Sequence, residues 1–315
     1  MIRIGVVGAG IIGASHKKAI LGNPECILAA ACDLDVEKAK AMAEGTDARV
    51  YTDYRVMQES EELDAVILNL PHFLHEPVSV YFLEKGIAVL VEKPMANSVK
   101  ECDAMIAASK KSGAPLAVGH VQRYFPAYRA LKEIIASGRL GKLCQITETR
   151  NINYFSNRPA WFLDKKKAGG GIIMNYGAHT LDKVFYSTGL EVESVFAAGN
   201  NVLSDDSVEA TAQMLVRFKG GVSGVFSYSG AHGPSYYQTD FYFTDGVVRI
   251  SRGGAELWVA EGATPLAKVE IEPYDLFRDQ LAEFVKLLRK EESEIVLPDY
   301  GRRVIAALED AVSQF

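Results

Sequence analysis

Three residues with polar or proton-accepting side chains recur at helical spacing in the second half of the chain. Asn175, His179 and Asp182 stand at positions i, i+4 and i+7, so a helix would present all three on one face. Three glycines at 169–171 open this helix and permit close approach to its backbone. A neutral histidine can accept a proton near pH 7. A core histidine with satisfied hydrogen bonds is the alternative for His179 alone, and its two polar neighbours favour a functional face.

A second candidate group is Lys93, within the sequence Glu92-Lys93-Pro94. The apolar run Ala88–Val91 before it predicts a strand of a parallel sheet. Ligands of such sheets bind outside the carboxyl ends of the strands, so we expect Lys93 at the ligand-binding edge of this sheet. A surface lysine in a turn is the alternative. A cis bond before Pro94 would fix the direction of the lysine.

A glycine-rich turn near the N-terminus meets the demands of dinucleotide binding. The pattern Gly8-x-Gly10-x-x-Gly13 follows the apolar run Ile2–Val7. In such a turn the first glycine allows the tight bend and the second lets the backbone approach a pyrophosphate. The third lets helix and strand pack together. A glycine-rich turn without a ligand is the alternative.

The residues after this turn complete the cofactor motif. A helix N-terminus at Ile11 and Ile12 offers free N–H groups and a positive dipole end to phosphates. Asp33 follows the last glycine by 20 residues, where an acidic side chain can bind the hydroxyls of the adenosine ribose. Asp33 followed by Leu34 favours NAD, because a carboxylate repels the 2′-phosphate of NADP. Lys38 is the nearby cation and is expected to point outward.

The first 120 residues alternate strands with helices, which implies right-handed crossovers and a parallel sheet. Strands are predicted over Ile2–Val7, Ile27–Cys32, Val50–Tyr51, Asp64–Leu70, Ala88–Val91 and Leu116–Gly119. Helices are predicted over Ile12–Leu21, Val36–Glu44, Glu76–Lys85 and Ser98–Ser112. Residues 1–121 are therefore predicted to form an NAD-binding Rossmann domain of the α/β class.

The pattern changes after about residue 121. A linking helix is predicted over Phe125–Ser137, and longer strands with period-2 alternation follow. These strands are Lys142–Ile152, Val192–Asn200, Val208–Phe218, Val222–Ser229, Tyr236–Thr244 and Val247–Ile250, with later helices over Phe277–Arg289 and Tyr300–Ser313. Alternation buries one sheet face and leaves the other free. Residues 122–315 are thus predicted to form an α+β substrate and oligomerisation domain with an open-faced, mostly antiparallel sheet.

Composition argues against several classes of protein. A formal net charge of -6 over 315 residues argues against a general nucleic-acid binder. No apolar run reaches the length of about 18 residues that a membrane helix needs, and the first residues do not resemble a signal peptide. The four cysteines are scattered without a CxxC pair, which argues against a disulfide framework or a zinc site and favours a reducing cytoplasm: Cys26, Cys32, Cys102 and Cys144.

Taken together, these motifs resemble those of the glucose–fructose oxidoreductase / inositol dehydrogenase (Gfo/Idh/MocA) family. The resemblance covers nearly the whole chain. Besides the glycine turn, its motifs are Pro71 with His75, Glu92-Lys93-Pro94, Gly119-His120-x-x-Arg123-Tyr124, the Gly171-to-Asp182 stretch and the helix from Phe277. Membership implies a Rossmann domain followed by an open-faced sheet domain, which pairs into homodimers or homotetramers. It also implies hydride transfer between NAD(P) and a secondary hydroxyl of a sugar, cyclitol or nucleotide sugar.

The resemblance further implies roles for single residues. Lys93 would bind the reacting oxygen, and His179 would take the hydroxyl proton as hydride leaves for the nicotinamide. Asp182 would bind a neighbouring substrate hydroxyl. Many members carry an aspartate where this chain has Asn175, which can still orient His179 or bind a hydroxyl. Asparagine at this position is similar to members that oxidise nucleotide-linked sugars.

Other residues would complete the two binding regions. Pro71 would line the cofactor groove together with Glu92, and His75 would cap the helix that follows. Three residues expected between the domains are candidates for the substrate pocket: Arg123, Tyr124 and Trp161. An interdomain salt bridge and two packed aromatic rings are the alternatives for them.

Two other classes of function remain open. A hydrolase or lyase of the same family uses bound NAD transiently and shows no net redox change. A non-catalytic NAD-binding sensor is the third class, and the retained Lys93 and His179 argue against it. The aromatic-rich segments around residues 150–170 and 230–240 would shape the pocket, but sequence does not fix their conformation or the substrate.

Overall fold

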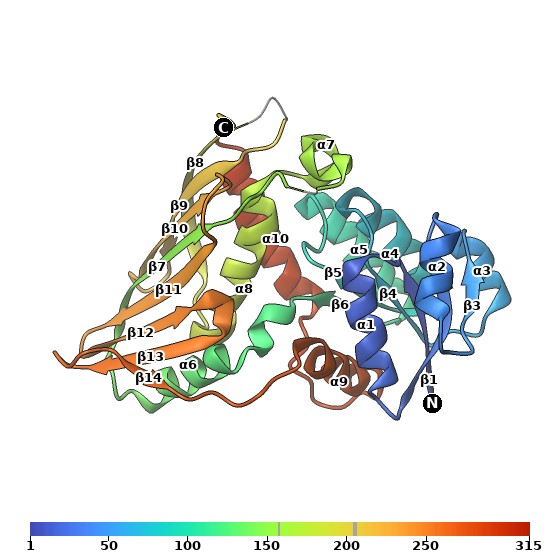
Figure 1. Ribbon diagram of the computed structural model, residues 1–315, viewed down its shortest axis with the longest axis horizontal. Coiled ribbons are helices and arrows are strands. Elements are labelled where there is room, and N and C mark those ends of the chain that lie inside the picture. Colours follow the sequence, from blue (N-terminus) through green and yellow to red (C-terminus); the bar gives the residue numbers. More distant parts are fainter. Residues whose placement is uncertain (157, 204–206) are drawn as a thin grey trace. The chain divides into compact units, whose positions relative to one another are not determined.

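The computed structural model describes residues 1–156, 158–203 and 207–315 and divides into two compact units (Figure 1). The first unit comprises Met1–Val121 and Asp275–Arg303, and the second comprises Gln122–Tyr274 and Val304–Phe315. The segment Asp275–Arg303 belongs to the first unit, although it lies within the range 122–315 of the predicted second domain.

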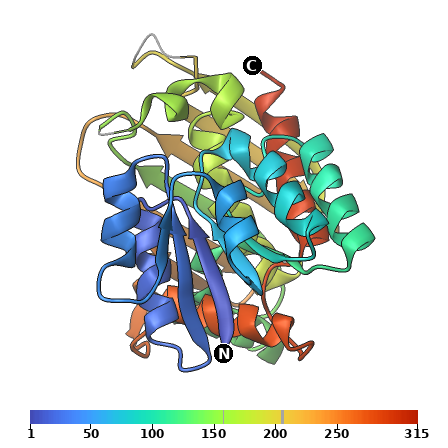
Figure 2. The ribbon, with the colours of Figure 1, turned by 90° about the vertical axis from the view of Figure 1, so that its right-hand side faces the viewer.

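The first unit is built on a six-stranded parallel sheet, whose N-terminal strands are seen in blue tones in Figure 2. Its strands are β1 (Ile2–Val7), β2 (Cys26–Cys32), β3 (Arg49–Tyr51), β4 (Ala65–Leu68), β5 (Ala88–Glu92) and β6 (Leu116–Gly119). Their order is β3-β2-β1-β4-β5-β6, so the order reverses between β1 and β4. In doubly wound sheets the ligand binds at such a switch point, outside the carboxyl ends of the strands. The predicted Rossmann architecture is confirmed.

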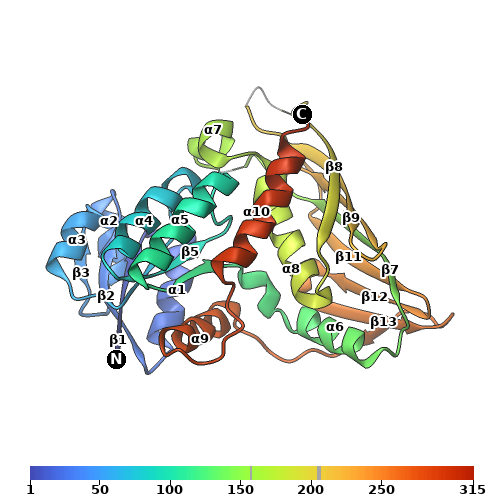
Figure 3. The same ribbon diagram turned by 180° about the vertical axis from the view of Figure 1, so that it is seen from behind.

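Helices cover both faces of this sheet (Figures 1 and 3). They are α1 (Ile11–Leu21), α2 (Val36–Ala43), α3 (Tyr54–Ser60), α4 (His75–Glu84), α5 (Val99–Ser112) and α9 (Leu276–Leu288), with the first part of α10 (Pro298–Val312). Helix α1 packs against α9, and α4 packs against α5. The core on the α1 side includes Ile4, Ile20 and Phe284, all fully buried. The apolar strands β4 and β5 are hydrophobic throughout because both of their faces are covered.

Several helix ends follow directly from local sequence. The Asp35 carboxylate accepts hydrogen bonds from the first N–H groups of α2, and Ser98 does the same for α5. Glu101 completes the N-terminal box of α5 by accepting from the N–H of Asn97, at 2.9 Å. Gly113 ends α5 with a left-handed φ of 77°, as predicted.

The second unit is built on an eight-stranded sheet in the order β14-β13-β12-β11-β7-β10-β9-β8. Its strands are β7 (Leu143–Asn151), β8 (Val192–Asn200), β9 (Thr211–Phe218), β10 (Ser223–Ser229), β11 (Tyr236–Phe243), β12 (Gly246–Ser251), β13 (Glu256–Glu261) and β14 (Ala267–Val269). Only the β7–β10 pair is parallel among the pairings of the described strands. The mostly antiparallel sheet is confirmed, although β13, β14 and the helix α3 of the first unit were not predicted.

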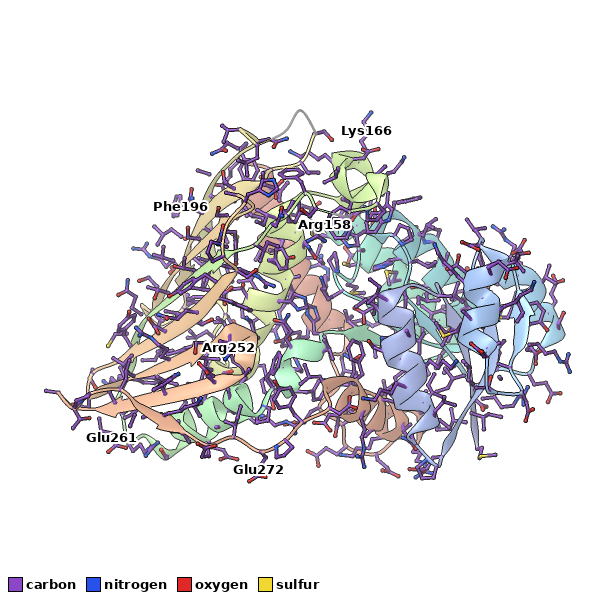
Figure 4. All side chains as sticks on the ribbon, in the orientation of Figure 1. Arg158, Lys166, Phe196, Arg252, Glu261 and Glu272 are labelled. Carbon is purple, nitrogen blue, oxygen red and sulfur yellow. The ribbon has the colours of Figure 1, made fainter. Side chains whose placement is uncertain are left out.

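Within the described part of the chain, helices lie on one face of this second sheet (Figures 1 and 3). They are α6 (Pro126–Ser137), α7 (Lys165–Ala168), α8 (Ala178–Thr188) and the last part of α10. On the other face, Phe196, Leu215 and Val225 form a row of paired residues across β8, β9 and β10, and all three are exposed. Figure 4 labels Phe196 on this uncovered side and Arg158 on the side of α8. None of the described helices is long and apolar enough to cross a membrane.

Candidate active site

In the glycine turn of the first unit, the fold itself requires two of the three glycines, and it does not require the third. A Cβ on Gly8, whose φ is +94°, would lie 2.3 Å from the carbonyl oxygen of Asn69. A Cβ on Gly13 would lie 2.4 Å from the carbonyl oxygen of Gly8. A Cβ on Gly10 meets nothing within 4 Å. The protein itself leaves the space beside Gly10 open, which fits the close approach of a phosphate group.

The helix that follows this turn presents its N-terminus without protein capping. Gly10 is the N-cap residue of α1, and no side chain accepts a hydrogen bond there. Ile11 is 89% exposed and Ile12 is 42% exposed. Free N–H groups of a first helical turn bind anions, and the helix dipole favours a negative charge at this end. The turn therefore fits the pyrophosphate of a dinucleotide.

Replacement of Gly13 by alanine should affect stability, whereas replacement of Gly10 by alanine should affect cofactor binding. Gly13→Ala should destabilise the protein, because its Cβ would collide with backbone 2.4 Å away. Gly10→Ala should leave the free energy of unfolding within about 0.5 kcal/mol and weaken NADH binding by at least about tenfold. Chemical denaturation and fluorescence titration measure the two effects. Unchanged NADH affinity in Gly10→Ala would contradict this assignment.

Asp33 links the end of β2 to the glycine turn. One carboxylate oxygen accepts from the N–H of Ala9 at 2.8 Å, and the other accepts from the N–H of Asp35 at 2.9 Å. An ionised carboxylate has about four acceptor sites, so capacity for ribose hydroxyls remains. Lys38 lies 3.7 Å from Asp35, with which it forms an exposed ion pair. This agrees with the expectation that Lys38 does not serve a phosphate beside Asp33.

His75 joins the segments after two neighbouring strands. Its Nδ1 lies 2.8 Å from the carbonyl oxygen of Pro94, and its Nε2 lies 2.9 Å from that of Leu70. The expected helix cap is wrong: Leu74 is the N-cap residue of α4 and no side chain caps it. Burial lowers the pKa of His75, although both carbonyl contacts oppose this effect. The ring instead holds the chain at Pro71 and the chain at Pro94 in fixed positions.

Glu92 supports the backbone of Lys93 at the end of β5. Its Oε1 lies 3.0 Å from Nε2 of His16 on α1, and its Oε2 accepts from the N–H of Lys93 at 3.2 Å. Burial raises the pKa of Glu92, but the hydrogen bonds and charges of His16 and Lys93 together outweigh it, so the pKa lies below its usual value. The Lys93–Pro94 peptide bond is cis, as the sequence permitted. These contacts assign Glu92 a supporting position beside Lys93; direct contact with the cofactor stays a prediction.

In the second unit the expected catalytic face is buried but not purely α-helical. A π-helical turn, Ile173–Gly177, precedes α8. Asn175, His179 and Asp182 are 4%, 7% and 0% exposed. The wider π turn places Asn175 at a different angle from the one that an uninterrupted α-helix would give, so the single-face argument holds for His179 and Asp182 only. Such turns occur often at functional sites.

The three glycines before this helix serve Glu209, which sequence reasoning missed. The Glu209 carboxylate accepts from the N–H of Gly171 at 2.8 Å and from that of Ile173 at 3.0 Å. A Cβ on Gly171 would lie 2.1 Å from the Glu209 carbonyl oxygen. The close approach predicted at residues 169–171 is therefore made by protein backbone. Glu209 caps the start of the helical segment that carries His179.

Asp182 forms a buried ion pair with Arg123. The Nε of Arg123 donates to Oδ1 of Asp182 at 3.1 Å, and its Nη2 contacts the same oxygen. Both side chains are almost completely buried. This salt bridge of Arg123 lies within the second unit, to which both residues belong. Tyr124 is buried beside it, whereas Trp161 is only half-buried and packs on the ring of Phe162.

A second buried charge pair fixes α8 to the sheet. Glu148 on β7 accepts from Oγ1 of Thr239 at 2.7 Å and lies 3.3 Å from Nζ of Lys183 on α8. It also accepts from the hydroxyl of Thr180. Burial lowers the pKa of Lys183 to about 8, and the nearby Glu148 opposes this effect. The signal in the sequence is a glutamate at an inward position of an alternating strand, which needs a buried partner.

Comparison with models of protein families shows to which family the chain belongs. A family model described as an oxidoreductase family with an NAD-binding Rossmann fold matches residues 2–120. A model described as the GFO/IDH/MocA C-terminal domain matches residues 128–249. The chain belongs to the GFO/IDH/MocA family. This confirms the resemblance found in the sequence, and it makes NAD the cofactor class of the first unit in this GFO/IDH/MocA protein.

The names of similar proteins describe more than one kind of reaction. The chain is 30% identical over 234 residues to myo-inositol 2-dehydrogenase of Thermotoga maritima, covering 72% of this chain and 68% of that protein. It is 31% identical over 199 residues to 2,7-anhydro-N-acetylneuraminate hydratase of Mediterraneibacter gnavus, covering 62% of this chain and about half, 52%, of that protein. Levoglucosan dehydrogenase in complex with NADH shares the fold, with a TM-score of 0.90 at 19% identity over 99% of this chain and 96% of that one.

Proposed function

We propose that this chain is an NAD-dependent dehydrogenase acting on a secondary hydroxyl of a sugar, cyclitol or nucleotide sugar, or on the corresponding ketone. The open space beside Gly10 carries this proposal, because it leaves room for the close approach of a cofactor phosphate. The uncapped start of α1 and the carboxylate of Asp33 support binding of the other parts of NAD. The inositol dehydrogenase relative supports the class of substrate.

The reaction assigns a distinct task to each polar group. Bound NAD supplies the hydride acceptor. Lys93 donates a hydrogen bond to the reacting oxygen, and His179 takes the hydroxyl proton at a ring nitrogen. Asp182 binds a neighbouring hydroxyl while the hydrogen bond from Arg123 orients its carboxylate. Asn175 orients His179 or a substrate hydroxyl.

A screen of polyols, free sugars and nucleotide sugars tests this function through NADH absorbance. Net NADH formation with one of these classes is the expected result. The hydratase relative favours one competing function, in which NAD is regenerated in each turnover. Substrate consumption without net NADH would support that lyase-like chemistry and contradict the dehydrogenase. Binding of NAD and sugar without turnover of either kind would indicate a sensor.

Asp33 predicts a preference for NAD over NADP of at least about tenfold, which corresponds to about 1.4 kcal/mol. The physical reason is repulsion between its carboxylate and the 2′-phosphate, with Leu34 90% exposed and offering no positive charge. Titration with NADH and NADPH measures the ratio, and Asp33→Asn should reduce it. Equal affinities of the unchanged protein for the two cofactors would contradict the prediction.

The uncovered sheet face supports pairing of two copies into a homodimer or homotetramer. Phe196 is 60% exposed and Leu215 is 46% exposed on adjacent strands. Leu215→Glu should place a charge in this apolar row and shift the protein toward monomer in analytical ultracentrifugation. Val56→Glu, at a 50% exposed position of the first unit, is the matched control. A monomeric unchanged protein would refute this assembly.

The spacing of the cysteines predicts a reducing cytoplasm as the setting of this protein.

A further inference from the structure

Two buried nitrogen atoms of a partly exposed guanidinium in the second unit have no hydrogen-bond acceptor among the described residues. Arg150 lies next to the last residue of β7, and its Nε and Nη1 atoms are buried. Among the residues that the structure describes, none accepts a hydrogen bond from these atoms. Burial lowers the pKa of Arg150, yet a guanidinium stays charged at neutral pH. A buried charge without acceptors is costly, so a missing partner is the simplest explanation.

Two tyrosine rings shape the surroundings of this guanidinium. Its Cζ lies 3.7 Å from the ring centroid of Tyr176 and 4.3 Å from that of Tyr237. Rings interact with the flat faces of a guanidinium, whereas its N–H groups donate in its plane. The rings therefore stabilise the charge without satisfying its donors. Both rings are anchored, since the Tyr176 hydroxyl accepts from Arg158 at 2.8 Å and the Tyr237 hydroxyl donates to Gln122 at 3.5 Å.

The charges around Arg150 leave one positive charge without a matching carboxylate. Lys183 lies 4.3 Å from the ring centroid of the same Tyr237 and forms its ion pair with Glu148 at 3.3 Å. Glu148 is also occupied by Thr180 and Thr239. The Asp182 carboxylate, whose charge also acts on Lys183, is paired with Arg123. Three cations, Arg123, Arg150 and Lys183, thus share two carboxylates among the described residues. The surplus favours an anion from outside the chain.

The position of Arg150 connects it with the proposed reaction. Tyr176, on which the guanidinium stacks, precedes His179 by three residues, about one helical turn. A substrate whose hydroxyl reaches His179 could therefore extend an anionic group toward the start of the same helix. A guanidinium recognises a pair of anionic oxygens by two parallel hydrogen bonds, from Nη2 together with either Nε or Nη1.

We infer that Arg150 binds an anionic group of the substrate, so that this chain acts on a sugar or cyclitol that carries a carboxylate or phosphoryl group. The inference rests on the proposed function, because it places the anion on the molecule that is oxidised. Among possible anions, the carboxylate of a sugar acid matches the planar guanidinium most closely.

Binding to the full chain in the presence of NAD⁺ tests this inference. The probes are D-glucuronate and D-galacturonate, each compared by calorimetry with its neutral sugar, and D-glucose 6-phosphate as the phosphoryl arm. We expect at least one acid to bind about tenfold more tightly than its neutral partner. Arg150→Gln should reduce that ratio to less than about threefold. Tight binding of the phosphate and not of the uronates would assign the phosphoryl source to the same site.

Two further variants show whether Arg150→Gln loses selectivity because the anion site is gone or because the protein no longer folds. Arg217→Gln removes the same charge from an exposed position of β9 and should leave the ratio unchanged. Arg150→Lys keeps the buried charge but not the planar fork, so it should fold and still lose selectivity for the acid. Acids that bind no better than neutral sugars would overturn the inference, as would a ratio that neither Arg150 variant changes.

The outcomes also separate this inference from the proposed function. Oxidation of a neutral polyol with kcat/KM unchanged in Arg150→Gln would reject the anion site and leave the dehydrogenase intact. Arg150-dependent binding of an acid, with no NADH from any compound, would support the anion site and reject the dehydrogenase.

Discussion

Replacement of His179 by asparagine should lower kcat by about 10²–10⁴-fold, the range that general acid–base catalysis contributes. Asparagine can hydrogen-bond a hydroxyl but cannot take its proton. NADH formation at saturating substrate measures this loss. NADH affinity should stay unchanged, because the glycine turn and Asp33 belong to the first unit, whereas His179 belongs to the second. A lower kcat with intact cofactor binding identifies a step in the chemistry.

The dependence of kcat/KM on pH distinguishes a catalytic role of His179 from a structural one, because a structural role would leave this dependence unchanged. In the unchanged protein kcat/KM should fall toward acidic pH, because a protonated histidine accepts no proton. His179→Asn should flatten this acidic limb. His232→Asn, at an exposed position, is the matched control and should keep both the rate and the limb. Unchanged turnover in both His179→Asn and Lys93→Met would refute the assignment of catalysis to these residues.

The cofactor-binding turn was predictable because its requirements are local. Gly8, Gly13 and Asp33 act within one strand–turn–helix–strand segment, and the contacts of each lie within the same segment or the adjacent strand. Short apolar runs likewise predicted most strands of the first sheet, and the alternation of apolar and polar residues predicted most strands of the second. The place of Gly10 in the motif likewise predicted a close approach to its backbone, and the protein leaves the space beside it open.

The buried contacts that hold the helix of His179 in place could not be predicted, because the residues that form them are far apart in sequence. Glu148 and Lys183 are separated by 35 residues, and Glu209 and Gly171 by 38. Either residue of such a pair looks like an ordinary surface charge or a flexible glycine until the fold brings its partner beside it. The π-helical turn at Ile173–Gly177 also escaped prediction, since its sequence fits an α-helix equally well.

The buried pair of Arg123 and Asp182 should show the largest effect on stability. Arg123→Met leaves the fully buried Asp182 carboxylate without its cation, which should lower the free energy of unfolding by about 3–5 kcal/mol. Asp182→Asn alone leaves the guanidinium without its anion and should be destabilising for the same reason. The double variant should recover much of the loss, because no unpaired charge remains. Chemical denaturation of the full chain measures all four proteins.

The same four proteins separate a structural from a substrate-binding role of Asp182. A coupling energy below about 0.5 kcal/mol between the two changes would contradict a direct interaction. If Asp182 only stabilises the fold, the double variant should regain turnover together with stability. If Asp182 also binds a substrate hydroxyl, stability should return while KM stays raised, because asparagine cannot replace the charged acceptor. We expect the second result, since Arg123 contacts Oδ1 of Asp182 on the helix that also carries His179.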